Sequence, residues 1–186
     1  FSGFNVTITY KETIIGFLDE VDEMARKIGA VNTVVLEDGK WKGYNTDYDG
    51  FLYLFKQLEM LQKKSATILG TGGAAKMVYH ALMDLGFEDI SVVSRSLDSD
   101  TEYFKKARYM DYIALENRMQ SSNLLVNCTP LGMSSQIDAM PVSKKQLGFY
   151  EAVIDLIYNP PETKLTHEAS RLGIKVLGGT DMFVVQ

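Results

Sequence analysis

A short glycine-rich segment is the first feature of the sequence whose residue types and spacing could do chemistry. Residues 70–75 match the pattern G-x-G-x-x-A, in which Gly70 makes a tight turn and Gly72 lets the backbone approach a pyrophosphate, while Ala75 permits close packing of a helix on a sheet. A strand is predicted before this segment and a helix after it, which favours dinucleotide binding over an ordinary turn. The pyrophosphate would lie against the free N–H groups at the helix start. The candidate cofactor-binding residues here are Gly70, Thr71, Gly72, Gly73 and Ala74.

The end of the next predicted strand indicates which dinucleotide is bound. An NAD site usually places an acidic residue there, which accepts a hydrogen bond from the ribose 2′-hydroxyl. This chain has Ser94-Arg95-Ser96 instead, and a guanidinium flanked by hydroxyls suits the 2′-phosphate of NADP. Asp98 and Asp100 follow closely and weigh against that interpretation, and a solvated surface role for Arg95 stays open. The balance favours NADP.

A secondary alcohol can be oxidised only if a base takes the hydroxyl proton, and histidine is the usual base. The chain has two histidines, His80 and His167, and both fall inside predicted helices rather than at the mouth of a cleft. No cluster of cysteine and histidine offers a metal site. Lys11 follows the first predicted strand, and Asp47 begins a helix whose dipole stabilises a carboxylate. Position alone favours the alternatives, a surface lysine and a helix cap.

A predicted hairpin brings some of these polar residues together. The pair Asp38-Gly39 between two strand-like runs is typical of a two-residue type I′ turn, and such a turn fixes the register of both strands. In that register Asn32 lies opposite Asn45, so Asn32 faces the segment that leads into Asp47. Before the hairpin we expect a strand at residues 4–8 and a helix at residues 18–28.

After the hairpin, helices and strands alternate. We expect helices at 47–61, 73–85 and from 159 to a stop at Gly173, and strands at 66–69, 90–94, 124–128 and 153–158. The polar stretch 97–121 is hard to assign. Such alternation predicts an α/β protein with a Rossmann-like doubly wound parallel sheet and crossover helices.

Composition narrows the class of protein. The chain has 186 residues and a net charge of -5, and this mild acidity argues against a nucleic-acid groove. No apolar run reaches the length of a membrane span. The single cysteine, Cys128, excludes an internal disulfide and favours a reducing, cytoplasmic location. Cys128 itself is expected to be a small buried apolar residue.

Five further motifs appear in order around the glycine loop. They read Asn5-Val6-Thr7-Ile8-Thr9-Tyr10-Lys11, Ile28-Gly29-Ala30-Val31-Asn32-Thr33, Gly43-Tyr44-Asn45-Thr46-Asp47, Asn127-Cys128-Thr129-Pro130-Leu131-Gly132-Met133 and Asp155-Leu156-Ile157-Tyr158-Asn159-Pro160. Taken together over nearly the whole chain, they closely resemble the shikimate dehydrogenase family.

The resemblance implies roles that position alone leaves open. Lys11 and Asp47 match the family's catalytic pair: Lys11 would exchange the proton with the reacting hydroxyl, and Asp47 would hold the substrate and the lysine in place. The matched substrate contacts are Thr7, Asn32, Tyr158 and Gln186, and the matched positions beside the cofactor are Thr129, Leu131, Gly179 and Met182.

The chain also departs from the family's pattern. Thr9 and Tyr10 stand where the family usually has proline and histidine, and no second basic residue follows Arg95 at once. The family's first segment, with paired serines for the substrate carboxylate, has no counterpart. We therefore expect that the chain lacks its natural N-terminal segment and that the C-terminus is cut as well.

These observations predict an incomplete, smaller α/β substrate-binding domain at residues 1–62 and an NADP-binding domain at 63–180. Residues 181–186 would start a helix that returns to the first domain. The expected reaction is the reversible, NADP-dependent reduction of 3-dehydroshikimate to shikimate, a step of aromatic amino-acid (chorismate) biosynthesis. The alternatives are an NAD-using quinate/shikimate dehydrogenase and a dinucleotide-binding protein without catalysis. A folate-linked dehydrogenase would share the two-part layout but have a different lysine motif. We expect a monomer or a homodimer.

Overall fold

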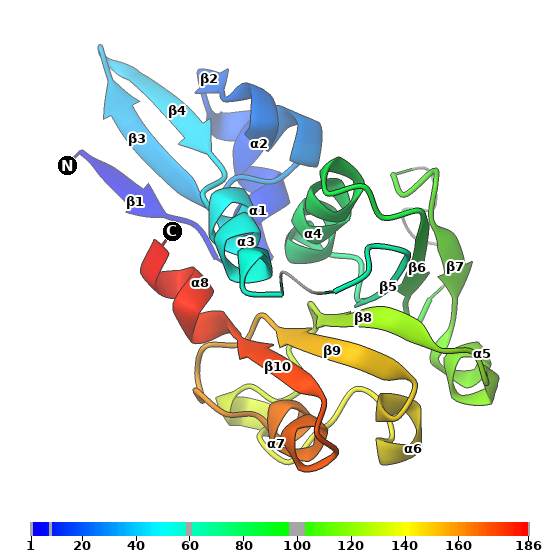
Figure 1. Ribbon diagram of the computed structural model, residues 1–186. Coiled ribbons are helices and arrows are strands. Elements are labelled where there is room, and N and C mark those ends of the chain that lie inside the picture. Colours follow the sequence, from blue (N-terminus) through cyan, green and yellow to red (C-terminus); the bar gives the residue numbers. More distant parts are fainter. Residues whose placement is uncertain (1, 8, 59–60, 97–102, 186) are drawn as a thin grey trace.

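The computed structural model of this chain describes residues 2–7, 9–58, 61–96 and 103–185. These residues form two sheets: sheet A has four strands, and sheet B has six. Figure 1 shows sheet A with its helices at the upper left and sheet B with its helices at the lower right. The α/β class predicted from the alternation of elements is confirmed.

Sheet A is mixed and is built from the first quarter of the chain. Its strands, in spatial order, are β1 (Gly3–Asn5), β3 (Thr33–Glu37), β4 (Lys40–Tyr44) and β2 (Glu20–Val21). Three short helical elements connect them, namely α1 (Tyr10–Thr13), the 3₁₀ turn η1 (Ile14–Phe17) and α2 (Glu23–Ile28). β3 and β4 pair antiparallel in the predicted register.

The hairpin turn is confirmed by its backbone. Asp38 and Gly39 have φ angles of 51° and 77°, and positive φ at both central residues is what a type I′ turn requires. The helix expected at 18–28 begins only at Glu23, because Glu20 and Val21 pair with β4 and the carboxylate of Asp22 caps the helix start. The first strand ends at Asn5, earlier than predicted.

All strands of sheet B are parallel. In spatial order they are β10 (Lys175–Gly178), β9 (Tyr150–Asp155), β8 (Ser122–Asn127), β5 (Ser65–Leu69), β6 (Asp89–Val93) and β7 (Arg108–Met110). Numbered from β5 along the chain, this is the order 3-2-1-4-5-6 of a doubly wound nucleotide-binding sheet. The strand order reverses between β5 and β8, where such folds open a crevice for a ligand.

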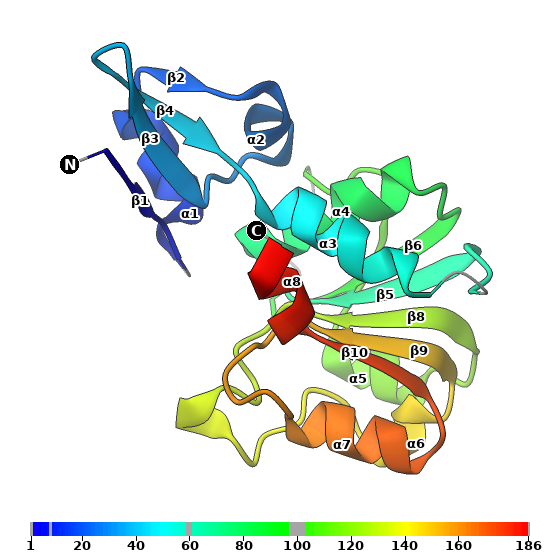
Figure 2. The same cartoon turned by 60° about the vertical axis from the view of Figure 1, so that its left-hand side comes forward.

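Helices cover both faces of sheet B (Figure 2). α3 (Asp47–Lys56) and α4 (Gly73–Asp84) lie on one face, over buried side chains such as Ile68. α5 (Tyr112–Asn117), α6 (Lys144–Leu147) and α7 (Lys164–Arg171) lie on the other, over Leu69 and its neighbours. Ile68 and Leu69 point to opposite faces because side chains alternate along a strand. The prediction of a doubly wound sheet is confirmed.

Two further predicted helix bounds are wrong. α3 ends at Lys56 rather than at residue 61. α7 begins at Lys164, not after Asn159, because Thr163 and Thr166 form a capping box that sets the first turn there.

Two helices lie where the sheets meet. α8 (Gly179–Val185) follows β10 and runs beside α3, and Figures 1 and 2 show this pair between sheet A and sheet B. The return helix predicted from residue 181 thus begins two residues earlier. The 3₁₀ turn η2 (Ser134–Gln136) lies in the loop after β8. Within the residues described above, no helix has the length and apolar character that crossing a membrane requires.

Candidate active site

The end of the β3–β4 hairpin brings Asn32 and Asp47 together, as the register predicts. Asn32 donates from Nδ2 to Asp47 Oδ1 at 2.9 Å, and its Oδ1 accepts from the backbone N–H of Thr46 at 2.9 Å. Both side chains are buried. A buried carboxylate needs hydrogen-bond donors, and Asn32 supplies one of them.

Lys11 supplies the other donor. Its Nζ lies 2.5 Å from Asp47 Oδ2, and its side chain is only 16% exposed. Asp47 is the first residue of α3, with Thr46 at the N-cap position, so its carboxylate faces Lys11 rather than capping the helix. The alternatives of a surface lysine and a helix cap therefore do not describe this pair.

The pair faces a cavity of about 180 Å³. Among the residues predicted for the site, its walls include Thr7, Lys11, Asn32, Asp47, Ala74, Tyr158, Gly179 and Met182. The walls also include residues to which no role was assigned from the sequence, namely Asn5, Val6, Met77, Leu156 and Phe183. The motifs contain Asn5, Val6 and Leu156, but the inward direction of Met77 and Phe183 depends on the packing of α4 and α8. Gln186 lies outside the described residues.

Tyr158 and Phe183 form an aromatic wall of this cavity. Their rings stack at 4.6 Å between centroids with an interplanar angle of 16°. Tyr158 belongs to the loop after β9 and Phe183 to α8, so the stack joins the two segments that border the cavity on the side of sheet B.

The glycine loop connects β5 to α4 and has the geometry that a pyrophosphate needs. Gly70 has φ of 101°, and its N–H donates to Val93 O at 2.8 Å. Gly72 is the N-cap of α4 and offers no side-chain acceptor, and a Cβ added there would meet no atom within 4 Å. The first turn of α4 is thus approachable, and its N–H groups and positive dipole end suit an anion. Thr71, between the two glycines, is partly exposed.

Gly73 differs from the other glycines of the loop. It is buried, and a Cβ added to it would lie 3.1 Å from Ala30 Cβ and 3.4 Å from Lys11 Cβ. Its missing side chain therefore lets α4 approach the lysine, a contact that the glycine motif alone does not predict.

The residues predicted to read the ribose lie at the end of β6. Ser94 is buried, while Arg95 and Ser96 are exposed, and the N–H of Ser96 donates to Ser94 Oγ at 3.3 Å. Asp98 and Asp100, which weighed against NADP, lie outside the described residues. Donors at this strand end fit a 2′-phosphate.

Thr129 and Leu131 lie in the loop after β8, next to the glycine loop. A Cβ on Gly70 would come within 3.4 Å of Thr129, and Thr129 Oγ1 donates to Asn127 Oδ1 at 2.7 Å. The N–H of Leu131 in turn donates to Thr129 Oγ1 at 3.3 Å. Asn127 belongs to one of the sequence motifs, but only the tertiary structure shows that its side chain accepts hydrogen bonds from Thr129 in this loop.

Asp155, at the end of β9, is bound to the same network. It is fully buried and accepts from Asn127 Nδ2 at 3.0 Å, from Thr163 Oγ1 at 2.6 Å and from the N–H of Ile157 at 3.2 Å. None of these donors is charged, and burial raises the pKa of Asp155 to about 6 against the opposing effect of the hydrogen bonds.

Neither histidine is among the residues that line the cavity. His80 lies in α4 with its ring edge-on to Tyr103, and burial lowers its pKa. His167 is on α7, where Nδ1 lies 3.6 Å from a carboxylate oxygen of Glu162. The lining of the cavity does include the ammonium of Lys11, whose Nζ contacts the carboxylate of Asp47.

Comparison with known proteins supports one family. A family model described as the shikimate dehydrogenase substrate binding domain matches residues 1–34. The chain is 40% identical over 185 residues to the shikimate dehydrogenase (NADP(+)) of Clostridium botulinum (strain Loch Maree / Type A3), covering 99% of this chain and 72% of that protein.

Two solved structures extend the similarity to the fold. The crystal structure of shikimate dehydrogenase 1 from Peptoclostridium difficile superposes with a TM-score of 0.92 at 39% identity, over 98% of this chain and 67% of that one. The shikimate 5-dehydrogenase of Thermus thermophilus, in complex with NADP(H) and shikimate, superposes with a TM-score of 0.82 at 35% identity, over 98% and 69%.

Proposed function

Because this chain belongs to the shikimate dehydrogenase family, we propose that it catalyses the reversible, NADP-dependent reduction of 3-dehydroshikimate to shikimate, with Lys11 and Asp47 as its catalytic pair. The reaction is a step of aromatic amino-acid biosynthesis. The observation that carries the assignment of the pair is their 2.5 Å contact at the wall of a cavity that the glycine-loop helix also borders.

The chemistry follows from the positions of the two groups. When bound, NADPH supplies the hydride that reduces the ketone carbon of the substrate. The ammonium of Lys11 donates a proton to the ketone oxygen as it becomes a hydroxyl, and in the reverse direction the neutral amine takes that proton back. Asp47 holds Nζ through Oδ2 while Asn32 fixes Oδ1, so the donor is aimed into the cavity before substrate arrives.

The same proposal assigns the binding residues. Thr7, Asn32 and Tyr158 line the cavity and would contact the polar groups of the substrate. The resemblance adds Gln186 as a further substrate contact. Each of these side chains can hydrogen-bond a hydroxyl or a carboxylate.

The cofactor would extend along the carboxyl edge of sheet B. We assign the pyrophosphate to Gly70–Ala74 and the 2′-phosphate to Ser94, Arg95 and Ser96. Thr129, Leu131, Gly179 and Met182 would border the rest of it, with Gly179 and Met182 nearest the reacting groups because they line the same cavity as Lys11.

We further propose residues 1–62 as the substrate-binding domain, 63–180 as the NADP-binding domain and 181–186 as part of the return helix. Within the first range, buried side chains of α3 pack against those of sheet B, so the two proposed domains are in direct contact. A cytoplasmic monomer or homodimer is proposed with the function, since a single cysteine suits a reducing compartment.

The decisive experiment is the turnover of the purified protein with shikimate, followed by NADPH absorbance. Lys11→Ala should lower kcat by at least about a hundredfold, because it removes the only general acid and base that we assign, whereas KM for shikimate should change by no more than a few fold. Lys40→Ala, an exposed lysine of the hairpin turn, is the matched control and should leave both constants unchanged.

Four assays, with shikimate or quinate and NADP or NAD, separate the related functions. The proposal expects the highest kcat/KM with shikimate and NADP. A preference for quinate and NAD would instead indicate an NAD-using quinate/shikimate dehydrogenase. Binding of NADPH without turnover of either acid, together with unchanged behaviour of Lys11→Ala, would indicate a dinucleotide-binding protein without catalysis.

A further inference from the structure

The helix that carries Lys11 cannot hold its own position. α1 has four residues, none of them buried, and its N-cap makes no side-chain hydrogen bond. An isolated helix of this length is unstable in water, because the cost of nucleation is not recovered. The location of Lys11 must therefore be set by contacts with other elements.

Residue 12, next to the lysine, makes such a contact with α4. Glu12 Oε2 lies 2.5 Å from Lys76 Nζ, and the side chain of Lys76 is only 9% exposed. The ammonium of Lys76 also lies 4.9 Å from the centre of the Tyr103 ring. A buried ammonium needs compensating partners, and Glu12, whose side chain is 39% exposed, supplies a carboxylate to it.

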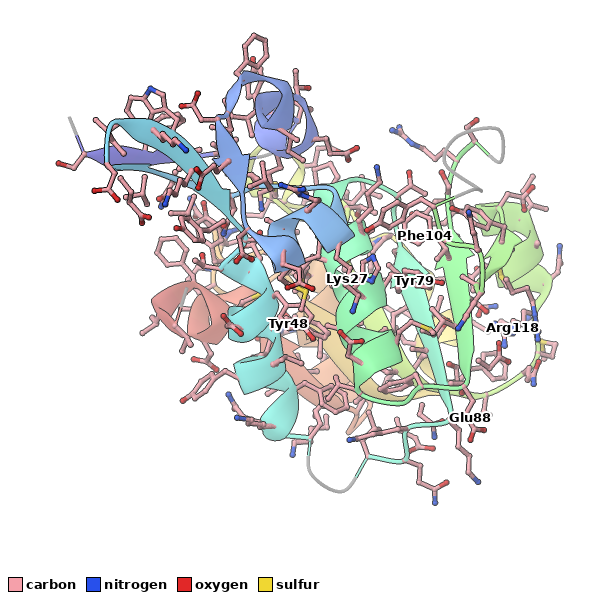
Figure 3. All side chains as sticks on the ribbon, turned by 90° about the horizontal axis from the view of Figure 1, so that it is seen from above. Lys27, Tyr48, Tyr79, Glu88, Phe104 and Arg118 are labelled. Carbon is pink, nitrogen blue, oxygen red and sulfur yellow. The ribbon has the colours of Figure 1, made fainter. Side chains whose placement is uncertain are left out.

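Residue 48, next to the aspartate, makes a second contact with the same helix. Tyr48 Oη donates to Asp84 Oδ2 at 2.8 Å, and Lys27 Nζ reaches the same carboxylate at 3.1 Å. Figure 3 labels Tyr48 and Lys27, which approach the end of α4 from α3 and α2. Lys76 and Asp84 are separated by about 12 Å along α4, at about 1.5 Å per residue.

Each member of the catalytic pair is thus followed in sequence by a residue anchored to α4. Gly73, at the start of that helix, lies close to Lys11, since a Cβ added there would come within 3.4 Å of Lys11 Cβ. α4 is also the helix whose first turn follows the glycine loop.

We propose that α4 acts as a template for the catalytic pair and that Glu12 and Lys76 are positioning residues for proton transfer by Lys11. The inference rests on the proposed function, since it concerns how the same lysine is aimed. Neither residue lines the cavity, and both act on Lys11 by fixing the position of α1.

Two substitutions that change charge in opposite senses test the proposal. Glu12→Gln removes a negative charge near Lys11, and Lys76→Met removes a positive one. If the pair acted only by its electric field, the two variants would shift the pH dependence of kcat in opposite directions. Loss of positioning instead lowers kcat in both, by about tenfold, with KM for shikimate and for NADP within about twofold of the parent.

A conservative double variant provides the rescue. Glu12→Asp shortens one side chain and Lys76→Arg lengthens the other, so the double variant keeps both charges and restores the contact that Glu12→Asp alone loses. It should recover most of the lost kcat. Glu20→Gln is the matched control, because it breaks an exposed ion pair with Lys40 in sheet A and should leave kcat unchanged.

A second readout does not depend on turnover. The rate at which dilute acetic anhydride acetylates Lys11, followed by peptide mass spectrometry, should rise at least about threefold in Glu12→Gln and Lys76→Met, because the partly buried amine becomes more accessible. If the parent protein proves inactive but the two variants still show this faster acetylation, the positioning role holds although the proposed function fails.

The overturning results are equally definite. If both single variants keep kcat and the acetylation rate within about twofold of the parent, α4 does not position Lys11. If Glu12→Gln and Lys76→Met fold poorly, the conservative variants still decide. A folded double variant whose kcat is as low as that of Glu12→Asp contradicts the proposal.

Discussion

At the scale of single residues, two buried carboxylates have opposite surroundings. Asp47 is bound by a cation, Lys11, and by the amide of Asn32. Asp155 is equally buried, but its donors are the amide of Asn127, the hydroxyl of Thr163 and a backbone N–H. Burial raises the pKa of Asp155, and the hydrogen bonds from its neutral donors only partly oppose that effect.

The raised pKa of Asp155 makes stability depend on pH. Its folded-state pKa of about 6 exceeds the unfolded value of 3.8, so the folded state binds the proton more tightly. The associated stabilisation is complete below about pH 4 and is lost as the pH rises through about 6. Relative to Asp155→Asn, which does not titrate, the free energy of unfolding of the parent should fall by up to about 3 kcal/mol over that window.

Denaturant unfolding of both proteins between about pH 4 and pH 7 measures this difference, and groups that titrate in both cancel. A difference that stays constant, or that grows with pH, would show that the network in fact favours the ionised carboxylate.

At the scale of elements, the start of α8 is the most tightly constrained junction near the cavity. A Cβ on Gly179 would overlap the carbonyl oxygen of Leu156, and the N–H of Gly179 already donates to Ile157 O at 3.2 Å. Backbone atoms cannot move aside as a flexible side chain can. Only glycine therefore lets α8 begin against the loop after β9 and place Met182 in the cavity wall.

Gly179→Ala should consequently destabilise the protein by about 1–3 kcal/mol and raise KM for shikimate, because α8 and its cavity residues are displaced. Thermal unfolding and steady-state kinetics measure the two effects. Gly16→Ala is the control, since a Cβ there meets no atom within 4 Å and should change neither quantity. Equal behaviour of the two variants would contradict the constraint described for α8.

At the scale of the whole molecule, helices α2 and α3 share one large hydrophobic core with sheet B, while Val34 of sheet A belongs to a smaller, separate cluster. The largest buried cluster contains Ile28 of α2 and Phe51 of α3 together with Ile68 of β5 and Ile154 of β9. Elements from both proposed domains thus bury their apolar surface against each other. The cavity is lined by Met77 and Met182 of this core and by Val6 of the smaller cluster.

This shared core predicts a single unfolding transition in calorimetry. Phe51→Ala should lower the stability of the entire chain by about 3–5 kcal/mol and move the one transition to lower temperature. Phe17→Ala, at a side chain 76% exposed, should leave the transition in place. Two separate transitions, only one of them shifted by Phe51→Ala, would mean that the parts unfold independently.

Local features of the structure could be predicted from the sequence because they depend on neighbouring residues. The Asp38-Gly39 turn and its register follow from the positive φ that this turn demands. The glycine loop between a strand and a helix, and the parallel sheet with helices on both faces, follow from pattern and periodicity. With these, the meeting of Asn32 and Asp47 was predictable from one hairpin.

Other features depend on residues distant in the sequence, and only the tertiary structure determines them. No local pattern indicates that Gly73 lies close to Lys11 as well as forming part of the glycine loop. Nor does any local pattern indicate that Glu12 pairs with Lys76, 64 positions away. The helix α1 has too little local stability to be predicted. The resemblance of the sequence to one family therefore pointed to Lys11 and Asp47, whereas the packing of α4 and α8 decided how the two side chains are held, because burial and contact are properties of the folded chain alone.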